Sequence, residues 1–295
     1  MTSMHLTKSW FQAPAFTALV LLSFSPDVGA QLNPGDDFHN DLETYGRYIP
    51  SRSAKDQSGS VGIIETESNY DYQFKAFSQL PVDLSINSQY IGINNSTAVF
   101  LPAHLTAVTT GIETTLPFFN LDRTYFHMGV FPSFYGDDWT YSSRNFRIPS
   151  KYYAIYKLND KWTLVAGAAV YPDYDTTVSP ILGFIYKPND KLTCFVVSDR
   201  QNISYALTDR FTVFVEGREK TDDEYIVTRN TTKDAVLRYT EGHLGTGVKF
   251  KINKNTDISL SGGEIFMNTF KYLDDNGKVV LKDGPYVELK FQLKI

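Results

Sequence analysis

Four histidines follow the short apolar stretch near the N-terminus of the chain: His39, His104, His127 and His243. A zinc site needs several ligands at close spacing, as in the HExxH and HxH patterns, and none of the four histidines belongs to such a pattern. The single cysteine, Cys194, stands in the apolar run LTCFVV, which excludes an intrachain disulfide and a cysteine-rich metal site. We therefore expect no metal and no cofactor.

The remaining catalytic possibilities are a serine beside a histidine and a pair of acids. No serine occupies the matching strand position around His104 (PAHLTAV) or His127 (YFHMGVF), which argues against a Ser-His hydrolase. The acid pairs in YGDDW and KTDDEY lie in polar segments, where such pairs are usually solvated or bind divalent cations loosely. The sequence predicts that the protein is not an enzyme, and we expect no catalytic residue.

Another set of charged residues follows a strict alternation near the C-terminus. In VELKFQLKI, residues 287–295, apolar residues alternate with charged or amide residues, which predicts a strand with one apolar and one polar face. The segments GTGVKFKI and FTVFVEGR follow a similar pattern. If the apolar faces meet lipid, the polar series points into an aqueous lumen. The predicted lumen-facing residues are Glu216, Arg218, Lys249, Lys251, Glu288 and Lys290.

Composition limits the class of protein that positions these residues. The chain has 295 residues, of which 15% are aromatic and 21% are charged, with a net charge of −5. Short alternating segments continue from residue 59 to the C-terminus, and helical periodicity is weak throughout. No run approaches the roughly 18 apolar residues of a spanning helix. Lys and Arg are scattered and do not form the basic stripe of a nucleic-acid binder. The sequence predicts an all-β protein with no nucleic-acid partner.

The N-terminal segment has the three parts of a secretory signal peptide. It combines Lys8 with a largely apolar stretch from Ala13 to Phe24 and the small residues Val28-Gly29-Ala30. We predict a signal peptide over residues 1–30 that is cleaved after Ala30. A polar, turn-rich flexible leader then spans residues 31–58, and the β-domain spans residues 59–295.

The connections between the predicted strands alternate in length. KLNDKW, KPNDKL, ALTDRF and KINKNT are tight turns, whereas YGDDWTYSSRN and PDYDTTVS are longer polar links. Short turns on one side and longer loops on the other are typical of outer-membrane barrels. The order of turns and loops places both ends of the domain on the tight-turn side, which requires an even number of strands. Thirteen candidate strands can be distinguished, and we predict twelve, with ten or fourteen as alternatives.

The signal peptide, the turn series LNDKW, PNDKL and LTDRF and the amphipathic terminal strand resemble those of Gram-negative outer-membrane β-barrel proteins. Within that group, residues 59–295 are most similar to an uncharacterised, medium-sized family known only as a domain of unknown function. The resemblance implies a closed, antiparallel, up-and-down transmembrane β-barrel in the cell outer membrane, in contact with its lipid and inserted by the barrel-assembly machinery. That machinery typically recognises a terminal strand that ends in an aromatic residue, whereas this chain ends in Ile295, with Phe291 four positions earlier.

The polar inward series favours a channel or passive transporter for small solutes, because a barrel of about twelve strands is narrow enough for its lining to select what passes. One alternative is a structural or surface-interaction barrel with a plugged lumen. A lipase or protease built on a barrel, and a soluble secreted β-sandwich that acts as a binding module, are further alternatives.

Overall fold

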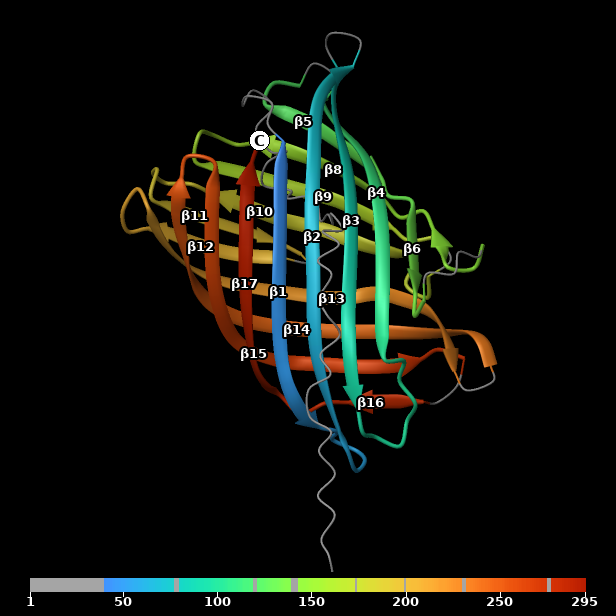
Figure 1. Ribbon diagram of the computed structural model, residues 1–295. Coiled ribbons are helices and arrows are strands. Elements are labelled where there is room, and N and C mark those ends of the chain that lie inside the picture. The colour runs from blue at the N-terminus through green and yellow to red at the C-terminus, as the bar shows by residue number, and fades with distance from the viewer. Residues whose placement is uncertain are drawn as a thin grey trace, which may run out of the picture.

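The computed structural model describes residues 40–76, 80–118, 121–138, 143–172, 174–198, 200–229, 232–274 and 277–295. These residues form seventeen β-strands, which belong to one sheet (Figure 1). None of the described segments forms a helix that is long and apolar enough to cross a membrane. The predicted signal peptide and residues 31–39 of the predicted leader lie outside the described residues.

Three of the seventeen strands are short and extend neighbouring wall strands: β6 (Ser133–Gly136), which pairs with β4 beyond the part that pairs with β5, β7 (Phe146–Arg147), which pairs with β6, and β16 (Lys278–Val280), which pairs with β15 beyond the part that pairs with β17. The wall consists of β1 (Asp41–Ser53), β2 (Ser60–Ala76), β3 (Leu80–Asn95), β4 (His104–Pro117), β5 (Thr124–Val130), β8 (Ser150–Lys157), β9 (Trp162–Val170), β10 (Val178–Tyr186), β11 (Leu192–Val197), β12 (Arg200–Ala206), β13 (Phe211–Arg229), β14 (Thr232–Asn253), β15 (Thr256–Tyr272) and β17 (Gly284–Lys294).

The sheet closes on itself through β1, which pairs with β2 on one side and with β17 on the other. β5 pairs directly with β8, and β15 pairs directly with β17, so that the three short strands leave the ring uninterrupted. The described residues therefore form a closed barrel of fourteen antiparallel strands. Closure gives each of the fourteen strands a hydrogen-bonded neighbour on both sides, which limits the backbone groups left unpaired.

Two predictions about the number and position of the strands are wrong. The barrel has fourteen strands instead of twelve, and Asp41–Ser53, which was predicted to lie in a flexible leader, is strand β1. The predicted even parity is confirmed, and Asn40 and Ile295 are hydrogen-bonded to each other at the junction of the two chain ends. The sequence does not predict β1, because two of its alternate positions hold Thr44 and Gly46 instead of apolar residues. The segment therefore lacks the alternation of apolar and polar residues that marks the other strands.

The outer surface of the wall is apolar. Residues that alternate with the inward series are exposed, and Ile112 and Leu182 each present 60% of their surface. In β17, Val287 and Leu289 are exposed while Glu288 is buried, as the alternation predicts. Further exposed apolar residues are Tyr48, Ile64, Ile86, Tyr152, Leu164, Ile203, Val215, Leu244, Val248, Leu260 and Phe291.

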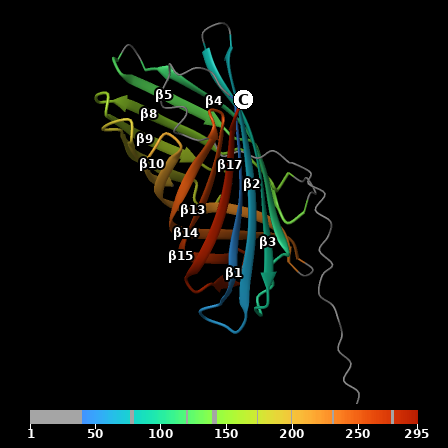
Figure 2. The same ribbon diagram turned by 60° about the vertical axis from the view of Figure 1, so that its left-hand side comes forward.

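The height of the wall differs strongly around the barrel. β13 and β14 contain 19 and 22 residues, whereas β11 and β12 contain 6 and 7. We call the end with the connections 158–161, 187–191, 207–210 and 254–255 the turn end, and the opposite end the loop end. The difference in height lies at the loop end, because Arg200, the first residue of β12, pairs with Arg218, whereas β13 continues to Arg229. Figure 2 shows the long strands β13, β14 and β15 beside β1–β3.

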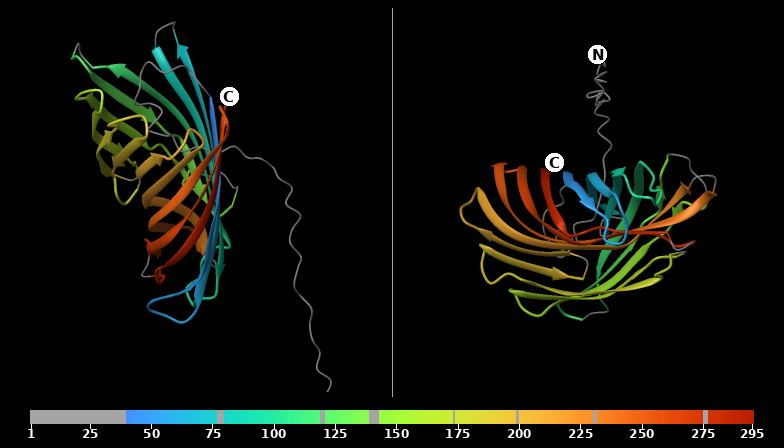
Figure 3. Two further views of the ribbon diagram at one scale, coloured as in Figure 1. Left: turned by 90° about the vertical axis from the view of Figure 1, so that its left-hand side faces the viewer. Right: turned by 90° about the horizontal axis from the view of Figure 1, so that it is seen from below.

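At the loop end the two tall parts of the wall pack against each other. β13–β15 cross behind β1–β4 at a steep angle (Figure 1), and the view from below shows the sheet folding back over itself (Figure 3). The space between them is filled by buried apolar side chains, among which Ile49, Ile63, Leu105, Leu237 and Phe270 have no exposed surface or almost none. This half of the interior is a packed core in the manner of two orthogonal sheets.

Candidate functional site

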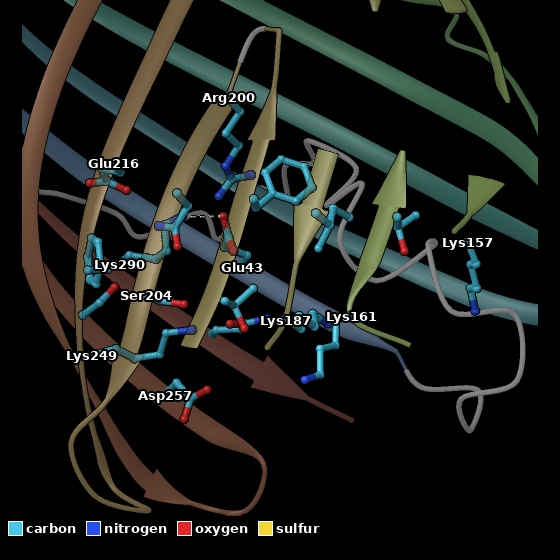
Figure 4. Close-up of a pocket in the computed structure, with 18 of the residues that line it drawn as sticks. Glu43, Lys157, Lys161, Lys187, Arg200, Ser204, Glu216, Lys249, Asp257 and Lys290 are labelled. Atoms are coloured by element: carbon cyan, nitrogen blue, oxygen red, sulfur yellow. Dashed lines mark ion pairs between the residues drawn. The ribbon is translucent and has the colours of Figure 1, made fainter. Parts of the chain in front are cut away.

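The interior near the turn end holds a cavity of about 640 Å³, which we call the lumen cavity (Figure 4). Its lining is mostly polar or charged, and Ile185, Phe195 and Phe214 are the apolar exceptions among the described lining residues. The polar and charged lining comprises Glu43, Arg123, Lys157, Asn159, Asp160, Lys161, Thr163, Lys187, Thr193, Arg200, Asn202, Ser204, Glu216, Lys249, Asp257, Ser259, Glu288, Lys290 and Gln292.

Small residues on the inner face of β14 and β15 leave room for the cavity. Ser259 lines it directly, and Gly247 lies beside it in the same part of the wall. A Cβ atom at Gly247 would come within 2.5 Å of the Phe214 ring, so glycine allows that ring to lie close against β14. The cavity is therefore a consequence of side-chain size along these strands.

Cations gather on one side of the lumen cavity, which we call the cationic wall. Its members are Arg123, Lys157, Lys161, Lys187 and Arg200, and they belong to β8, to β12 and to turn-end connections. One acid, Asp160, lies among them. The connections that carry Lys161 and Lys187 are adjacent, since the backbone N–H of Lys187 donates to the carbonyl oxygen of Lys161 at 2.8 Å.

Asparagine side chains shape the tight turns that carry these lysines. Asn159 Oδ1 accepts hydrogen bonds from the backbone N–H groups of Lys161 at 2.9 Å and Trp162 at 3.0 Å. Asn189 Oδ1 makes the same pair of bonds to Lys191 and Leu192 in the next turn. Such asparagine turns replace backbone hydrogen bonds and fix a tight reversal. The repeated NDK sequence therefore fixes the turn backbone from which Lys161 extends to the mouth of the cavity.

Acids gather on the opposite side, which we call the acidic wall. Its members are Glu43, Glu216, Asp257 and Glu288, from β1, β13, β15 and β17. Lys249 and Lys290 lie among them, and Lys290 Nζ is 3.0 Å from Glu43 Oε1. Glu216 Oε1 and Asp257 Oδ1 are buried and have no hydrogen-bond partner among the described residues.

Beyond the cavity, toward the loop end, lies a cluster of buried charged side chains centred on Arg47. Arg47 forms ion pairs with Glu65 and, at 2.7 Å, with Glu241 Oε1. Glu65 is also paired with Lys220, and His243 Nδ1 is 2.9 Å from Glu241 Oε1. The side chains of Arg47, Glu65 and Glu241 have no exposed surface. We call this group the buried ion cluster.

Further polar groups extend the buried ion cluster across the lumen. The hydroxyl group of Tyr45 donates to Glu67 Oε2 at 2.5 Å and accepts from Arg218 at 3.3 Å. The hydroxyl group of Tyr225 donates to Gln89 Oε1 at 2.7 Å. Together with the apolar core behind it, this network fills the half of the interior between β1–β4 and β13–β15. The lumen cavity therefore lies beside the packed half, along the short strands β11 and β12.

The six predicted lumen-facing residues separate into three groups. Glu216, Lys249, Glu288 and Lys290 line the lumen cavity. Arg218 borders the buried ion cluster, with Nη2 at 3.8 Å from Glu67 Oε2. Lys251 is exposed near the end of β14, where it is paired in register with Asp257, and it does not line the cavity.

The histidines that fit no metal-binding pattern have side-chain partners where the structure describes them. His127 Nε2 is 3.0 Å from Glu113 Oε2, its Nδ1 is 3.0 Å from Thr115 Oγ1, and its ring stacks on Tyr153. His127 is completely buried, so this hydroxyl–histidine–carboxylate arrangement has no access for a substrate. Sequence reasoning missed the cluster, although Glu113 and Thr115 share one face of β4. His104 stacks on Tyr90 outside the cavity, and His39 lies outside the described residues.

The two acid pairs noted in the sequence are Asp137-Asp138 and Asp222-Asp223. Asp137 Oδ2 accepts a hydrogen bond from the backbone N–H of Thr228 at 2.8 Å in the loop-end region, and partial burial raises the pKa of the Asp137 carboxyl. The side chain of Asp222 is not described. Within the described part of the chain, no three His, Cys, Asp or Glu side chains come together in a group that would hold a metal ion.

The family model with the description Domain of unknown function (DUF6268) matches residues 82–295. The chain belongs to this family. The predicted resemblance to a family known only as a domain of unknown function is thereby confirmed. The DUF6268 match begins in β3, so β1 and β2 precede it, and of the residues that line the lumen cavity only Glu43 lies before it. No curated protein matches the chain.

Several solved structures share a distant similarity in the arrangement of their strands. An outer membrane channel from Pseudomonas putida F1 has a TM-score of 0.45 and 10% identity, covering 89% of this chain and 99% of that chain. A FadL homologue from Pseudomonas aeruginosa has a TM-score of 0.44 and 11% identity, covering 90% and 95%. The toluene transporter TodX from P. putida has a TM-score of 0.40 and 9% identity, covering 88% and 91%.

Proposed function

We propose that the protein is an outer-membrane barrel that conducts small polar solutes through the lumen cavity. The observation that supports the proposal is the direction in which this cavity extends through the barrel. Its lining begins at the tight turns, with Asn159 and Lys161, and extends to Arg200, the first residue of β12 at the loop end. The cavity thus follows the full height of the shortest part of the wall, where 6 and 7 residues make up the strands.

Residence in the outer membrane is supported by the outer face and by closure. A hydrocarbon environment requires that every backbone group is paired within the protein, and a closed antiparallel sheet meets that requirement. The exposed series of aliphatic and aromatic residues supplies the apolar band that lipid solvates. The predicted signal peptide over residues 1–30 supplies export, and the barrel-assembly machinery supplies insertion.

A second candidate function is that of a plugged barrel with a structural or surface-interaction role. The packed half of the interior favours it, because the apolar core and the buried ion cluster close the lumen between β1–β4 and β13–β15. The two candidates differ in one respect, which is whether solute passes along β11 and β12. A role as an enzyme has less support, because the His127 cluster is buried.

Solute entry into liposomes tests the proposal. The purified barrel, folded in vesicles and verified by faster migration before boiling than after, is expected to admit a small sugar alcohol such as erythritol. Ser204→Trp places a large ring in the lumen cavity and is expected to reduce entry strongly. Ile203→Trp is the matched control, because Ile203 is the adjacent residue on β12 and belongs to the exposed outer face. Folded wild-type protein that admits no solute would support the plugged barrel instead.

A further inference from the structure

The two walls of the lumen cavity carry opposite charge. The cationic wall holds five cations and the single acid Asp160. The acidic wall holds four carboxylates with Lys249 and Lys290, and the ion pair between Lys290 and Glu43 leaves three carboxylates beside one lysine. Figure 4 shows Glu216, Lys249 and Asp257 on one side of the cavity, with Lys157, Lys161 and Lys187 on the other. An electric field therefore runs across the lumen.

The cationic wall and the acidic wall are carried by different strands of the barrel, and this keeps their charges apart. The cations on one side are carried by β8, β12 and the connections at 118–123, 158–161 and 187–191, whereas the acids are carried by β1, β13, β15 and β17. The ring order places β1, β17, β15 and β13 on one arc of the barrel and β5 and β8–β12 on the other. Closure of the sheet fixes the two arcs opposite each other. The two arcs adjoin where β12 pairs with β13, and there Arg200 lies two residues from Asn202, the register partner of Glu216. The other members of the cationic wall lie on elements that do not pair with β1, β13, β15 or β17.

We propose that the lumen cavity selects zwitterionic solutes of the amino-acid type, which carry an ammonium group and a carboxylate group on one small skeleton. This inference rests on the proposed conduction of small solutes and names the class of solute. The carboxylate would pair with Lys161 and Lys187, and the ammonium would pair with Glu216 and Asp257. Glu216 and Asp257 line the cavity on the side that would meet the ammonium.

The opposed walls disfavour the other charge classes. A small anion is attracted by the cationic wall and repelled by the acidic wall, and a small cation meets the reverse, so repulsion from one side opposes the attraction to the other. A neutral polyol gains no charge interaction from either wall. A zwitterion is the solute that both walls attract at once when its dipole lies across the lumen. Selection thus combines an attractive element for one class with a repulsive element against the others.

The test compares two uncharged-overall solutes of similar size, L-serine and erythritol, by their rates of entry into liposomes that contain the folded barrel. Two partly exposed ion pairs correspond to a preference of roughly tenfold. We therefore expect L-serine to enter about ten times faster than erythritol. Equal rates would overturn the inference and leave the proposed function standing, because erythritol would still enter. Entry of neither solute would contradict the proposed function itself, and the inference with it.

Charge-removing variants then test whether the two walls cause the preference. The double variant Lys161→Gln/Lys187→Gln and the double variant Glu216→Gln/Asp257→Asn are each expected to reduce the ratio of serine to erythritol entry by about threefold or more. Lys278→Gln is the matched control, because Lys278 is exposed at the loop end, outside the cavity. A ratio that stays at the wild-type value in both double variants would overturn the assignment.

Discussion

At the scale of single residues, charged side chains inside this barrel have two kinds of surroundings. Those of the lumen cavity face an open polar space, whereas Arg47, Glu65 and Glu241 have no exposed surface. A buried charge is tolerated only when partners and hydrogen bonds replace the water it has lost. In the buried ion cluster that condition is met by contacts between strands far apart in sequence, since Arg47 and His243 are 196 positions apart. The cluster therefore ties β1 to β14 across the interior.

Removal of the central cation should destabilise the barrel strongly. Arg47→Met keeps a long side chain but leaves the carboxylates of Glu65 and Glu241 buried without their main partner. We expect a loss of about 3–5 kcal/mol in the free energy of unfolding, measured by urea titration of the protein in vesicles. Arg144→Met is the control, because Arg144 is 68% exposed in its ion pair with Asp234 and should lose no more than about 1 kcal/mol. Similar losses in both variants would contradict the structural role assigned to the buried ion cluster.

The alternation of apolar and polar residues identifies four of the six predicted residues as lining the lumen cavity, but Lys251 is exposed and Arg218 borders the buried ion cluster, and the pattern does not identify partners. Glu216, Lys249, Glu288 and Lys290 belong to the inward series by sequence, and all four line the lumen cavity. The partner of His127 is different in kind. Glu113 is 14 positions away, and the contact depends on the register between β4 and β5, which the intervening turn sets. Pattern determines the face on which a residue lies, whereas register determines what it touches.

At the scale of elements, closure of the barrel depends on a strand with an unremarkable sequence. β1 contains Thr44 and Gly46 at outward positions and Tyr45 and Arg47 at inward positions, so the two faces differ little in polarity. Thirteen candidate strands were recognised in the sequence because their faces contrast more strongly. The alternation of turns and loops requires an even number of strands, so thirteen candidates are one too many or one too few. β1 is the strand that the thirteen candidates lack. Pairing on both sides, with β2 and β17, is what stabilises a segment that its own composition would leave without structure.

A proline in β1 tests whether this strand closes the barrel. Thr44 is paired with Ser68 on β2 and Phe291 on β17, and proline has no N–H group to donate and fits poorly inside a sheet. We expect Thr44→Pro to destabilise the barrel by about 1–3 kcal/mol through the unpaired backbone acceptor. The fraction of protein that migrates faster before boiling should fall accordingly. Ser58→Pro, in the exposed connection 54–59, is the control and should fold like the wild type. Undiminished heat-modifiable migration of Thr44→Pro would show that β1 is dispensable for closure.

At the scale of the whole molecule, the unequal height of the wall divides the interior. The long strands β13–β15 pass over β1–β4 and bury their inner faces together, which produces the apolar core and the buried ion cluster. The short strands β11 and β12 have no such partner, and the lumen cavity lies along them. This division was not predictable from sequence, because it depends on how the strands tilt and bend once the ring is closed. Neither the lengths of the segments nor the alternation of apolar and polar residues predicts that curvature.

Thiol labelling tests the division into an open and a packed half. In a background with Cys194→Ser, a cysteine is placed either at Ser204, in the lumen cavity, or at Ile63, which is 1% exposed in the packed half. A charged maleimide that does not cross membranes should modify Ser204→Cys in the folded barrel on the order of 100 times faster, because Ile63→Cys reacts only after a local opening of the core. Labelling after denaturation controls for the intrinsic reactivity of each thiol. Comparable rates in the folded protein would mean that water fills both halves, and the route along β11 and β12 would then lose its distinction from the rest of the lumen.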